Sequence, residues 1–405
     1  MIDPYQLDGE FFQFLKENED KDYVDLLLKK SADPASEEIK RFAALQIRAR
    51  RSMRGKISHI LENNRFLIPD LLVSEQSSNE YVASYNASLA GAERLADLTA
   101  GLGIDAINFS AEVCEVVAVE KDEWRSRVME YNLKTLGIDN VKVVNNSAES
   151  FLEENREKYD FIYLDPSRRG EQGGRIFKLS DCQPDVEGLM PLLEKNCNRL
   201  LIKASPLLDL KDAEQRLPDI ERFHIVEYKR ECKEILIEIN FRKKEKCRPE
   251  ILCVNVMGEK EFQILEIPGI EKSDNRPLNA VEDLKPGLFL YEPSPSLLKS
   301  GRPDIVFKLD ENLRKLDPNT HLFVSENFIP EFPGKTLIME GILERKDYKT
   351  LKNKHFNVIS RNHPLKADKL IKKFSVIPGG EKYLLACKAC GKPIIILAED
   401  GRQLS

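Results

Sequence analysis

The residues best suited to chemistry begin with a glycine-containing segment, Asp97-Leu-Thr-Ala-Gly101-Leu-Gly103-Ile-Asp105-Ala106. We expect a strand before this segment and a helix after it. Glycine suits such a turn because a Cβ atom would keep the backbone away from a ligand, while the helix N-terminus presents free amides. By itself the glycine spacing is a weak signal, because it also satisfies the fingerprint of NAD-binding proteins. An ordinary turn between two solvated acids is the structural alternative.

Two acidic residues help to decide which cofactor this turn would hold. Asp97 lies four residues before Gly101, where a carboxylate would disfavour a pyrophosphate but favour the ammonium and sulfonium of S-adenosylmethionine. Glu120 ends the next expected strand, where it can accept hydrogen bonds from both ribose hydroxyls of either cofactor. We therefore predict S-adenosylmethionine as the cofactor, with Asp97, Gly101, Gly103 and Glu120 in contact.

A third acidic residue, Asp165, follows the expected strand Tyr159–Leu164 and is followed by Pro166 and Ser167. Ligands of open α/β sheets bind at the carboxyl ends of the strands. An exocyclic amine of a nucleobase is a poor nucleophile, because its lone pair is delocalised into the ring. Acceptors on its N–H groups would counter this delocalisation, and Asp165 with the carbonyl of Pro166 can be these acceptors. We predict that Asp165, Pro166 and Ser167 form the catalytic segment.

Further polar residues end the neighbouring strands. Ser147 follows the third strand, where it is either a contact to the adenine edge or a plain helix N-cap. Lys203 ends the fifth strand and is added to the catalytic set, where it either neutralises substrate charge or pairs with Asp165. Arg168 and Arg169 either bind a substrate phosphate or form a solvated pair.

The elements that must position these residues alternate between short apolar runs and helical patterns, which indicates a parallel sheet. A helix is expected from Asp122 to Leu136, ending at Gly137. The runs 223–228 and 234–241 are too close for a crossover helix, so they must be antiparallel neighbours. The fold class is therefore α/β, a Rossmann-like sheet with an antiparallel last hairpin. The expected parallel strands are Arg94–Leu98, Glu115–Glu120, Val141–Asn145, Tyr159–Leu164 and Arg199–Lys203.

The 405 residues exceed what one hydrophobic core usually organises. We predict a helical region over 1–90, the parallel-sheet domain over 91–245, and two small α+β domains over 250–332 and 333–405. Strands at Ile251–Gly258, Gln263–Ile267 and Gly287–Tyr291 are assigned to the first of these small domains.

The net charge of −6 and the pI near 5.7 do not indicate a nucleic-acid binder. Two basic zones, Lys40–Lys56 and Arg345–Lys382, are exceptions, and Arg50 and Arg51 in the first are candidate phosphate contacts. The alternative is that both zones are solvated faces, which is what charge runs on helices usually are. We expect no membrane span, no secretory signal and hence a cytoplasmic protein with reduced cysteines. The pair Cys387-x-x-Cys390 is half a zinc site, so no metal is expected.

Taken together, the motifs resemble those of the bacterial class I methyltransferases of the THUMP-like-domain group. The resemblance covers essentially the whole chain. It implies an N-terminal helical region, a methyltransferase domain, a ferredoxin-like domain and a C-terminal THUMP-like domain. It also extends the cofactor contacts to Gln76, Thr99, Asp105, Lys121, Ser147 and Asp165. The matching segments are 73–78, 97–105, 165–169, 203–209 and 231–236.

The same resemblance implies a substrate. THUMP domains occur in RNA-modifying enzymes, so a structured RNA such as rRNA or tRNA is expected. The sequence leaves the oligomeric state open, with a monomer favoured over a larger assembly. The catalytic domain is also similar to trimethylguanosine synthase, but Ser167 and Arg168 stand where that enzyme has proline and tryptophan. Its cap substrate therefore does not transfer. The leading hypothesis is a methyltransferase of an RNA base amine; the alternatives are a small-molecule or protein methyltransferase and a non-catalytic RNA-binding protein.

Overall fold

A computed structural model describes residues 2–28, 34–168, 179–243, 248–268 and 275–401. The chain divides into two compact units. The first unit comprises Met1–Lys229, Lys233–Glu250 and Val254–Ile264, and the second comprises Arg230–Cys232, Ile251–Cys253 and Leu265–Ser405. Each unit is described by itself.

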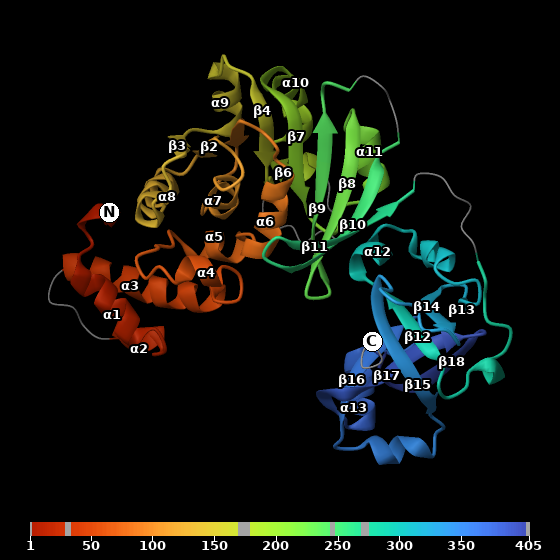
Figure 1. Ribbon diagram of the computed structural model, residues 1–405. Helices are drawn as coiled ribbons and strands as arrows, with labels where there is room; N and C mark the ends of the chain where they lie inside the picture. Colours follow the sequence, from red (N-terminus) through yellow and green to blue (C-terminus); the bar gives the residue numbers. More distant parts are fainter. Residues whose placement is uncertain (1, 29–33, 169–178, 244–247, 269–274, 402–405) are drawn as a thin grey trace. The chain divides into compact units, whose positions relative to one another are not determined.

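The first unit begins with short helices, as predicted (Figure 1). One of these helices begins at Pro34, where a proline lacks no needed hydrogen bond, and carries Glu37 in its first turn. Phe11, Phe42 and Ile47 bury their side chains beside the half-buried Trp124 of a later helix. The helices are α1 (Gly9–Asn18), α2 (Tyr23–Leu28), α3 (Pro34–Met53), α4 (Ser58–Leu61), α5 (Leu71–Gln76) and α6 (Glu80–Ser88), after a 3-10 turn at Pro4–Gln6.

A nine-stranded sheet forms the centre of this unit, in the order β11-β10-β8-β9-β7-β4-β1-β2-β3. Strands β3, β2, β1, β4 and β7 are parallel, and β9 pairs with β7 in the antiparallel sense. This confirms the predicted parallel sheet and its antiparallel neighbour. The bounds are β1 (Arg94–Asp97), β2 (Glu115–Glu120), β3 (Val141–Asn145), β4 (Tyr159–Leu164), β7 (Cys197–Ala204), β8 (Ile220–Tyr228), β9 (Glu231–Asn240), β10 (Glu250–Gly258) and β11 (Glu261–Ile267).

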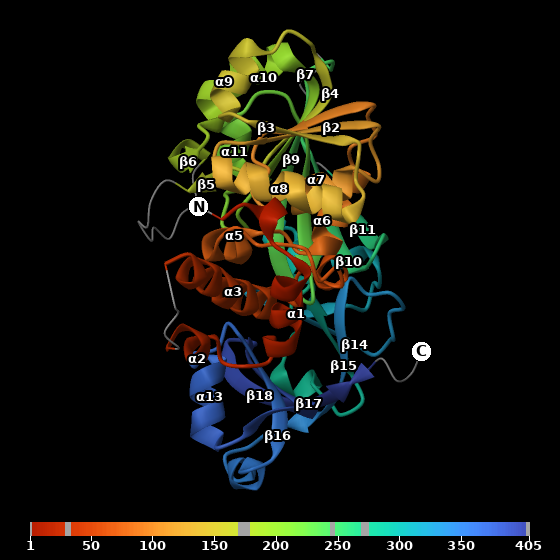
Figure 2. The ribbon, with the colours of Figure 1, turned by 90° about the vertical axis from the view of Figure 1, so that its left-hand side faces the viewer.

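The connecting helices pack on this sheet, with α6 against α7 and α9 against α10 (Figure 2). The predicted helix from Asp122 is present, since Asp122 caps it by accepting a hydrogen bond from Arg125 and Gly137 ends it with a φ of 71°. The helices are α7 (Ile104–Phe109), α8 (Glu123–Leu136), α9 (Ala148–Glu154), α10 (Val186–Asn196) and α11 (Leu210–Arg216). Strands β5 (Ser167–Arg168) and β6 (Cys182–Gln183) form a separate two-stranded sheet. A 3-10 turn at Leu179–Asp181 comes directly before β6.

Strands β10 and β11 correct one prediction, because they extend the nine-stranded sheet instead of belonging to a small α+β domain. Alternating burial indicates that a segment is a strand, but it does not indicate which sheet the strand joins. The edge of β8 offers unpaired N–H and C=O groups that β10 satisfies.

The second unit is built on a seven-stranded sheet in the order β13-β14-β12-β15-β18-β17-β16. The predicted boundary between residues 332 and 333 falls within this sheet, so the two predicted small domains share it. The bounds are β12 (Phe289–Pro293), β13 (Arg314–Asp317), β14 (Thr320–Ser325), β15 (Gly334–Ile342), β16 (His355–Arg361), β17 (Ile377–Ala389), β18 (Lys392–Asp400), α12 (Pro295–Lys299) and α13 (Ala367–Phe374), with 3-10 turns at Val281–Asp283, Pro303–Lys308 and Asp347–Leu351.

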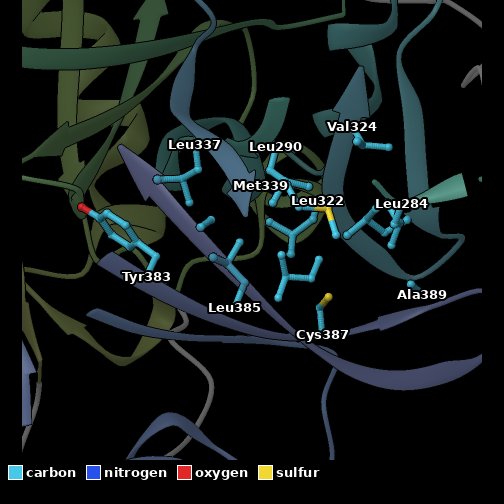
Figure 3. Close-up of a cluster of buried hydrophobic side chains, with 13 residues drawn as sticks. Leu284, Leu290, Leu322, Val324, Leu337, Met339, Tyr383, Leu385, Cys387 and Ala389 are labelled. Carbon is cyan, nitrogen blue, oxygen red and sulfur yellow. The ribbon is translucent and has the colours of Figure 1, made fainter. Parts of the chain in front are cut away.

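The core of the second unit gathers side chains from both predicted small domains. Leu290 and Leu322 come from the first of them, and Leu337 and Leu385 from the second (Figure 3). Cys387 lies in the same cluster, fully buried, and burial raises the pKa of its thiol to about 12. Within the described ranges, no helix is both long and apolar enough to cross a membrane.

Two buried side-chain amides fasten the N-terminal helices to the sheet domain. Asn132 of α8 donates to the carbonyl of Leu67 and accepts from its N–H, both at 2.8 Å. Gln46 of α3 makes the same pair of bonds with Ile68, at 2.7 and 3.0 Å. Both amides are fully buried, so the backbone at 67 and 68 has no water to replace them.

Replacing Asn132 with Leu should therefore lower the free energy of unfolding by about 2–4 kcal/mol, because the N–H and C=O of Leu67 lose their partners. The measurement is urea unfolding followed by the fluorescence of Trp124, the single tryptophan of the chain. Glu130→Gln on the exposed face of the same helix is the control and should change stability by less than about 0.5 kcal/mol. Equal stability of both variants would contradict the role of this amide.

Candidate active site

A cavity of about 690 Å³ opens at the carboxyl ends of the parallel strands in the first unit. Its volume falls within the range of roughly 300–1,000 Å³ that is typical of ligand pockets. The loops after β1, β2, β3 and β4 line it together with α5. The predicted site residues that line it are Gln76, Thr99, Gly101, Asp105, Glu120, Lys121, Ser147, Asp165 and Ser167.

The loop after β1 has the tight geometry that its glycines predict. Gly101 lines the cavity with a φ of 57°, and Gly103 starts α7 with a φ of 85°. A Cβ atom on Gly103 would lie 3.0 Å from Cγ of Met129, so a side chain would push the loop away from α8. Gly103 and the buried Asp97, which accepts a hydrogen bond from the N–H of Thr99 at 3.0 Å, are outside the cavity lining and support the loop from behind.

Glu120, the last residue of β2, holds the loop after β1 in place. One carboxylate oxygen accepts from the N–H of Gly101 at 2.9 Å, and the other accepts from the N–H of Asp122 at 2.8 Å. A carboxylate can accept about four hydrogen bonds, so Glu120 keeps capacity on the side that faces the cavity. Its position fits two ribose hydroxyls, which donate to carboxylates.

Ser147 combines the two roles that the sequence left open. Its hydroxyl caps α9 by accepting a hydrogen bond from the N–H of Ser150 at 3.1 Å. Ser147 also lines the cavity beside Asn146 and Glu149. The N-cap role is therefore confirmed, and a contact with a ligand stays a prediction.

Asp165 is fixed in the cavity by two contacts. Its backbone N–H donates to Oγ1 of Thr99 at 2.7 Å, which ties the end of β4 to the loop after β1. Its Oδ2 accepts from Nζ of Lys203 at 2.7 Å, so the predicted pairing of these residues is confirmed. Ser167 follows it on the cavity wall, whereas Pro166 is buried and outside the lining.

Lys203 lies at the centre of a buried polar cluster. Besides Asp165, its ammonium donates to Oγ of Ser78 at 2.8 Å and lies 3.9 Å from oxygens of both Asp105 and Glu234. Ser78 in turn donates to Oδ2 of Asp105 at 2.6 Å. Each member of this cluster comes from a different element or loop, so the ammonium connects β4, β7, β9 and α7 with the loop before α6.

The cluster holds more carboxyl groups than ammonium groups, and the pKa values of both kinds of group are raised. Burial, reinforced by Asp105, raises the pKa of Asp97 well above its usual range. Burial also raises the pKa of Asp165, against the opposing effect of Lys203, and raises that of Glu234 to about 7. For Lys203, burial opposes the charge, but the three neighbouring carboxylates raise its pKa above normal. The site therefore favours a positive charge.

Sequence reasoning did not assign Ser78 and Glu234 to the site, although both lie in the matched segments. Glu234 begins an apolar run of β9, where an acid next to Ile235 and Leu236 is an available signal of buried function. Tyr163 was also missed. Its hydroxyl is buried without a hydrogen-bond partner among the described residues, and burial raises the pKa of its phenol well above normal.

The structure gives the two arginines of the first basic zone other partners. Arg50 donates to the backbone carbonyls of Phe66, Leu61 and Asn63 at 2.6–3.3 Å. Arg51 donates to two backbone carbonyls near the end of α1. Both guanidiniums therefore help to hold the helical region together, and their contacts with phosphate stay predictions. Arg168 lies in β5, outside the cavity lining, and Arg169 lies outside the described residues.

Two protein families match parts of the chain. Residues 85–173 match the family described as conserved hypothetical protein 95, and residues 289–333 match a ferredoxin-like domain. A search of curated proteins found no match.

Among solved structures, one from Porphyromonas gingivalis W83, provisionally named a methyltransferase, is similar over nearly the whole length. The two chains are 26% identical, the match covers 98% of this chain and 99% of that one, and the TM-score is 0.77. Partial matches include a provisionally named methyltransferase from Escherichia coli (20% identity, 39% of this chain and 81% of that one, TM-score 0.29). Another, from Streptococcus mutans, was solved with SAH (15% identity, 41% and 99%, TM-score 0.29).

The strand order and the full-length match together assign the fold. The first unit has the class I methyltransferase fold, and a ferredoxin-like domain follows it in the chain.

The raised pKa of Glu234 predicts how stability depends on pH. The folded protein keeps this proton up to about pH 7, whereas an ordinary Glu loses it near 4.5. The folded state therefore binds more protons in this window, and the free energy of unfolding should fall as the pH rises through it. Glu234→Gln should reduce that fall by about 1–3 kcal/mol.

Urea unfolding from pH 4 to 8, followed by Trp124 fluorescence, measures this difference. Glu214→Gln, at an exposed position on α11, is the control and should follow the wild-type curve. A Glu234→Gln curve parallel to the wild type would show that Glu234 does not hold this proton.

Proposed function

We propose that this chain is an S-adenosylmethionine-dependent methyltransferase that methylates an exocyclic amine of a base in structured RNA. The main observation that supports this cofactor is the excess of acidic side chains in the cavity lining. Asp105, Glu120, Glu149 and Asp165 line it, against Lys121 and Arg125. Arg125 is paired with Asp70 at 2.8 Å.

This charge discriminates between cofactors that share the glycine loop. A pyrophosphate would need cations or free amides, and the carboxylates of this cavity would repel it. A sulfonium and an ammonium gain from the same carboxylates. The loop geometry alone would suit NAD equally well, and the acidic lining supports S-adenosylmethionine instead.

The residues present fit this cofactor. Glu120 would hold the ribose hydroxyls, Asn146 and Ser147 the adenine edge, and Asp105 with the loop after β1 the amino-acid end. When bound, the cofactor supplies an electrophilic methyl group. All other steps belong to the residues of this chain.

Asp165 acts as the hydrogen-bond acceptor for the substrate amine. Lys203 holds Oδ2 of Asp165 at 2.7 Å, which opposes the rise in the pKa of Asp165 that burial causes and leaves Oδ1 for the N–H of the amine. The carbonyl of Pro166 is the second proposed acceptor, since proline has no N–H that would compete. Both acceptors direct the amine lone pair away from the ring, and positioning supplies most of the rate enhancement.

The substrate class rests on the motif after β4 and on the resemblance to RNA-modifying enzymes. One observation favours the alternative of a small-molecule or protein substrate: Arg50 and Arg51 bind backbone carbonyls of the chain itself. Transfer of a labelled methyl group to RNA from a strain that lacks this gene, with mass spectrometry of the nucleosides, separates the two. Label in a base of the RNA supports the proposal, and label confined to protein or small molecules contradicts it.

Replacing Glu120 with Ala should weaken S-adenosylmethionine binding by about 1.5–3 kcal/mol, the usual loss for a charge-assisted hydrogen bond. Isothermal titration calorimetry measures the affinity. Glu120→Gln keeps an acceptor for Gly101 and should lie between the wild type and Glu120→Ala. Glu123→Ala, at the exposed start of α8, is the control and should leave the affinity unchanged. Micromolar binding of NAD without S-adenosylmethionine binding would refute the cofactor.

Asp165→Asn should lower methyl transfer by about 100-fold or more, because the amide cannot accept as strongly or take up a proton. Cofactor affinity should stay within several-fold of the wild type, since the proposed partner of Asp165 is the substrate amine. Rates are measured with labelled cofactor, and the exposed Asp139→Asn is the control. Near-normal turnover of the Asp165 variant would end its catalytic role.

A further inference from the structure

The second unit contains a pocket of about 380 Å³ that shares no residue with the methyltransferase cavity. The ends of β12 and β15 line it together with β16, β17, α12 and α13. All lining residues belong to the second unit, including Arg230. This volume suits a ligand the size of one nucleotide.

Two arginines in this pocket share one buried carboxylate. Glu292 is 3% exposed. Its Oε2 accepts a hydrogen bond from Arg230 at 2.9 Å, and its Oε1 forms an ion pair with Arg361 at 2.7 Å. A guanidinium has five N–H donors, and both side chains are more than 40% exposed. The carboxylate therefore orients the two guanidiniums but neutralises only one of their charges, and donors remain for a ligand.

Lys335 adds a third positive charge. It is the cross-strand partner of Glu292, yet its ammonium donates to the hydroxyl of Tyr383 at 2.7 Å and lies 3.9 Å from the centre of its ring. Figure 3 shows Tyr383 at the margin of the core cluster, with its hydroxyl oxygen directed away from the other side chains. The core thus fixes a tyrosine that holds Lys335 at the pocket.

The rest of the lining is largely apolar and partly open. Gly379 lies at a bulge of β17 where the pairing with β16 shifts, and its φ is 105°. A Cβ atom there would meet nothing within 4 Å. The positive φ requires a glycine at this bulge, and its lack of a side chain leaves this part of the pocket open. The apolar lining includes Pro295, Leu298, Val358, Ile371 and Pro378.

We propose that this pocket binds one nucleotide of single-stranded RNA. The phosphate lies against Arg230, Arg361 and Lys335, because arginine forks match phosphate oxygens in pairs. The base packs on the apolar lining, which an inorganic anion would not use. A base must be unstacked to enter, so a single strand or a chain end fits and a duplex does not. The proposal extends the proposed RNA substrate to a second contact and does not require methyl transfer.

The test is fluorescence anisotropy of a labelled eight-nucleotide oligouridylate with the full-length protein. Saturating S-adenosylhomocysteine keeps the cofactor part of the methyltransferase cavity in the same state in every sample, so a difference between variants reports on the second pocket. Arg361→Gln and Lys335→Met should each weaken binding by about fivefold or more and reduce its salt dependence by about 0.7 in log–log slope for each lost contact. Lys392→Gln removes an exposed charge at the other end of the β17–β18 hairpin and should stay within twofold of the wild type.

Each outcome decides the proposal. No binding by the wild-type protein, or equal affinity of all three variants, overturns it. Arg361→Gln could disturb Glu292, but Lys335→Met leaves both partners of that carboxylate and still tests the pocket. Uridine monophosphate that competes as well as the oligonucleotide would overturn RNA as the source, and inorganic phosphate that does so would overturn the base contact. Failure of S-adenosylhomocysteine to bind would refute the proposed function alone.

Discussion

The buried ammonium of Lys203 determines how the parts of the methyltransferase unit come together. A lone ammonium in such a place would be costly, and so would the carboxylates around it. Together, Asp165, Asp105 and Glu234 surround Lys203 within 3.9 Å. The excess of acids over bases is tolerated because some of them retain protons, as the raised pKa of Glu234 indicates. The same excess gives the cavity its preference for cationic ligands.

The sheet makes this cluster possible. Lys203 and Asp165 end adjacent parallel strands, β7 and β4, so they reach the same edge. The antiparallel β9 runs the other way beside β7, which brings the beginning of β9, with Glu234, to that edge as well. An all-parallel sheet would place the end of a strand there. The antiparallel strand is therefore part of the site and does more than complete the fold.

Much of the first unit could be predicted from the sequence. The alternation of apolar runs fixed β1, β2, β3, β4 and β7, and strand-end reasoning located Asp165, Lys203 and Glu120 at one edge. Local patterns failed where the answer depended on distant partners. They could not show that β10 would pair with β8, that the carbonyls of residues 61, 63 and 66 would bind Arg50, or that Ser78 would bridge Lys203 and Asp105.

The central claim is that the acidic cavity binds the cofactor so that its reactive end faces Asp165. A crystal structure of the protein with S-adenosylhomocysteine tests this most directly. We expect the ribose to contact Glu120 and the sulfur to lie on the side of the cavity formed by Asp165, with the Asp165–Lys203 contact intact. A ligand whose ribose lies away from Glu120, or whose sulfur points away from Asp165, would contradict it.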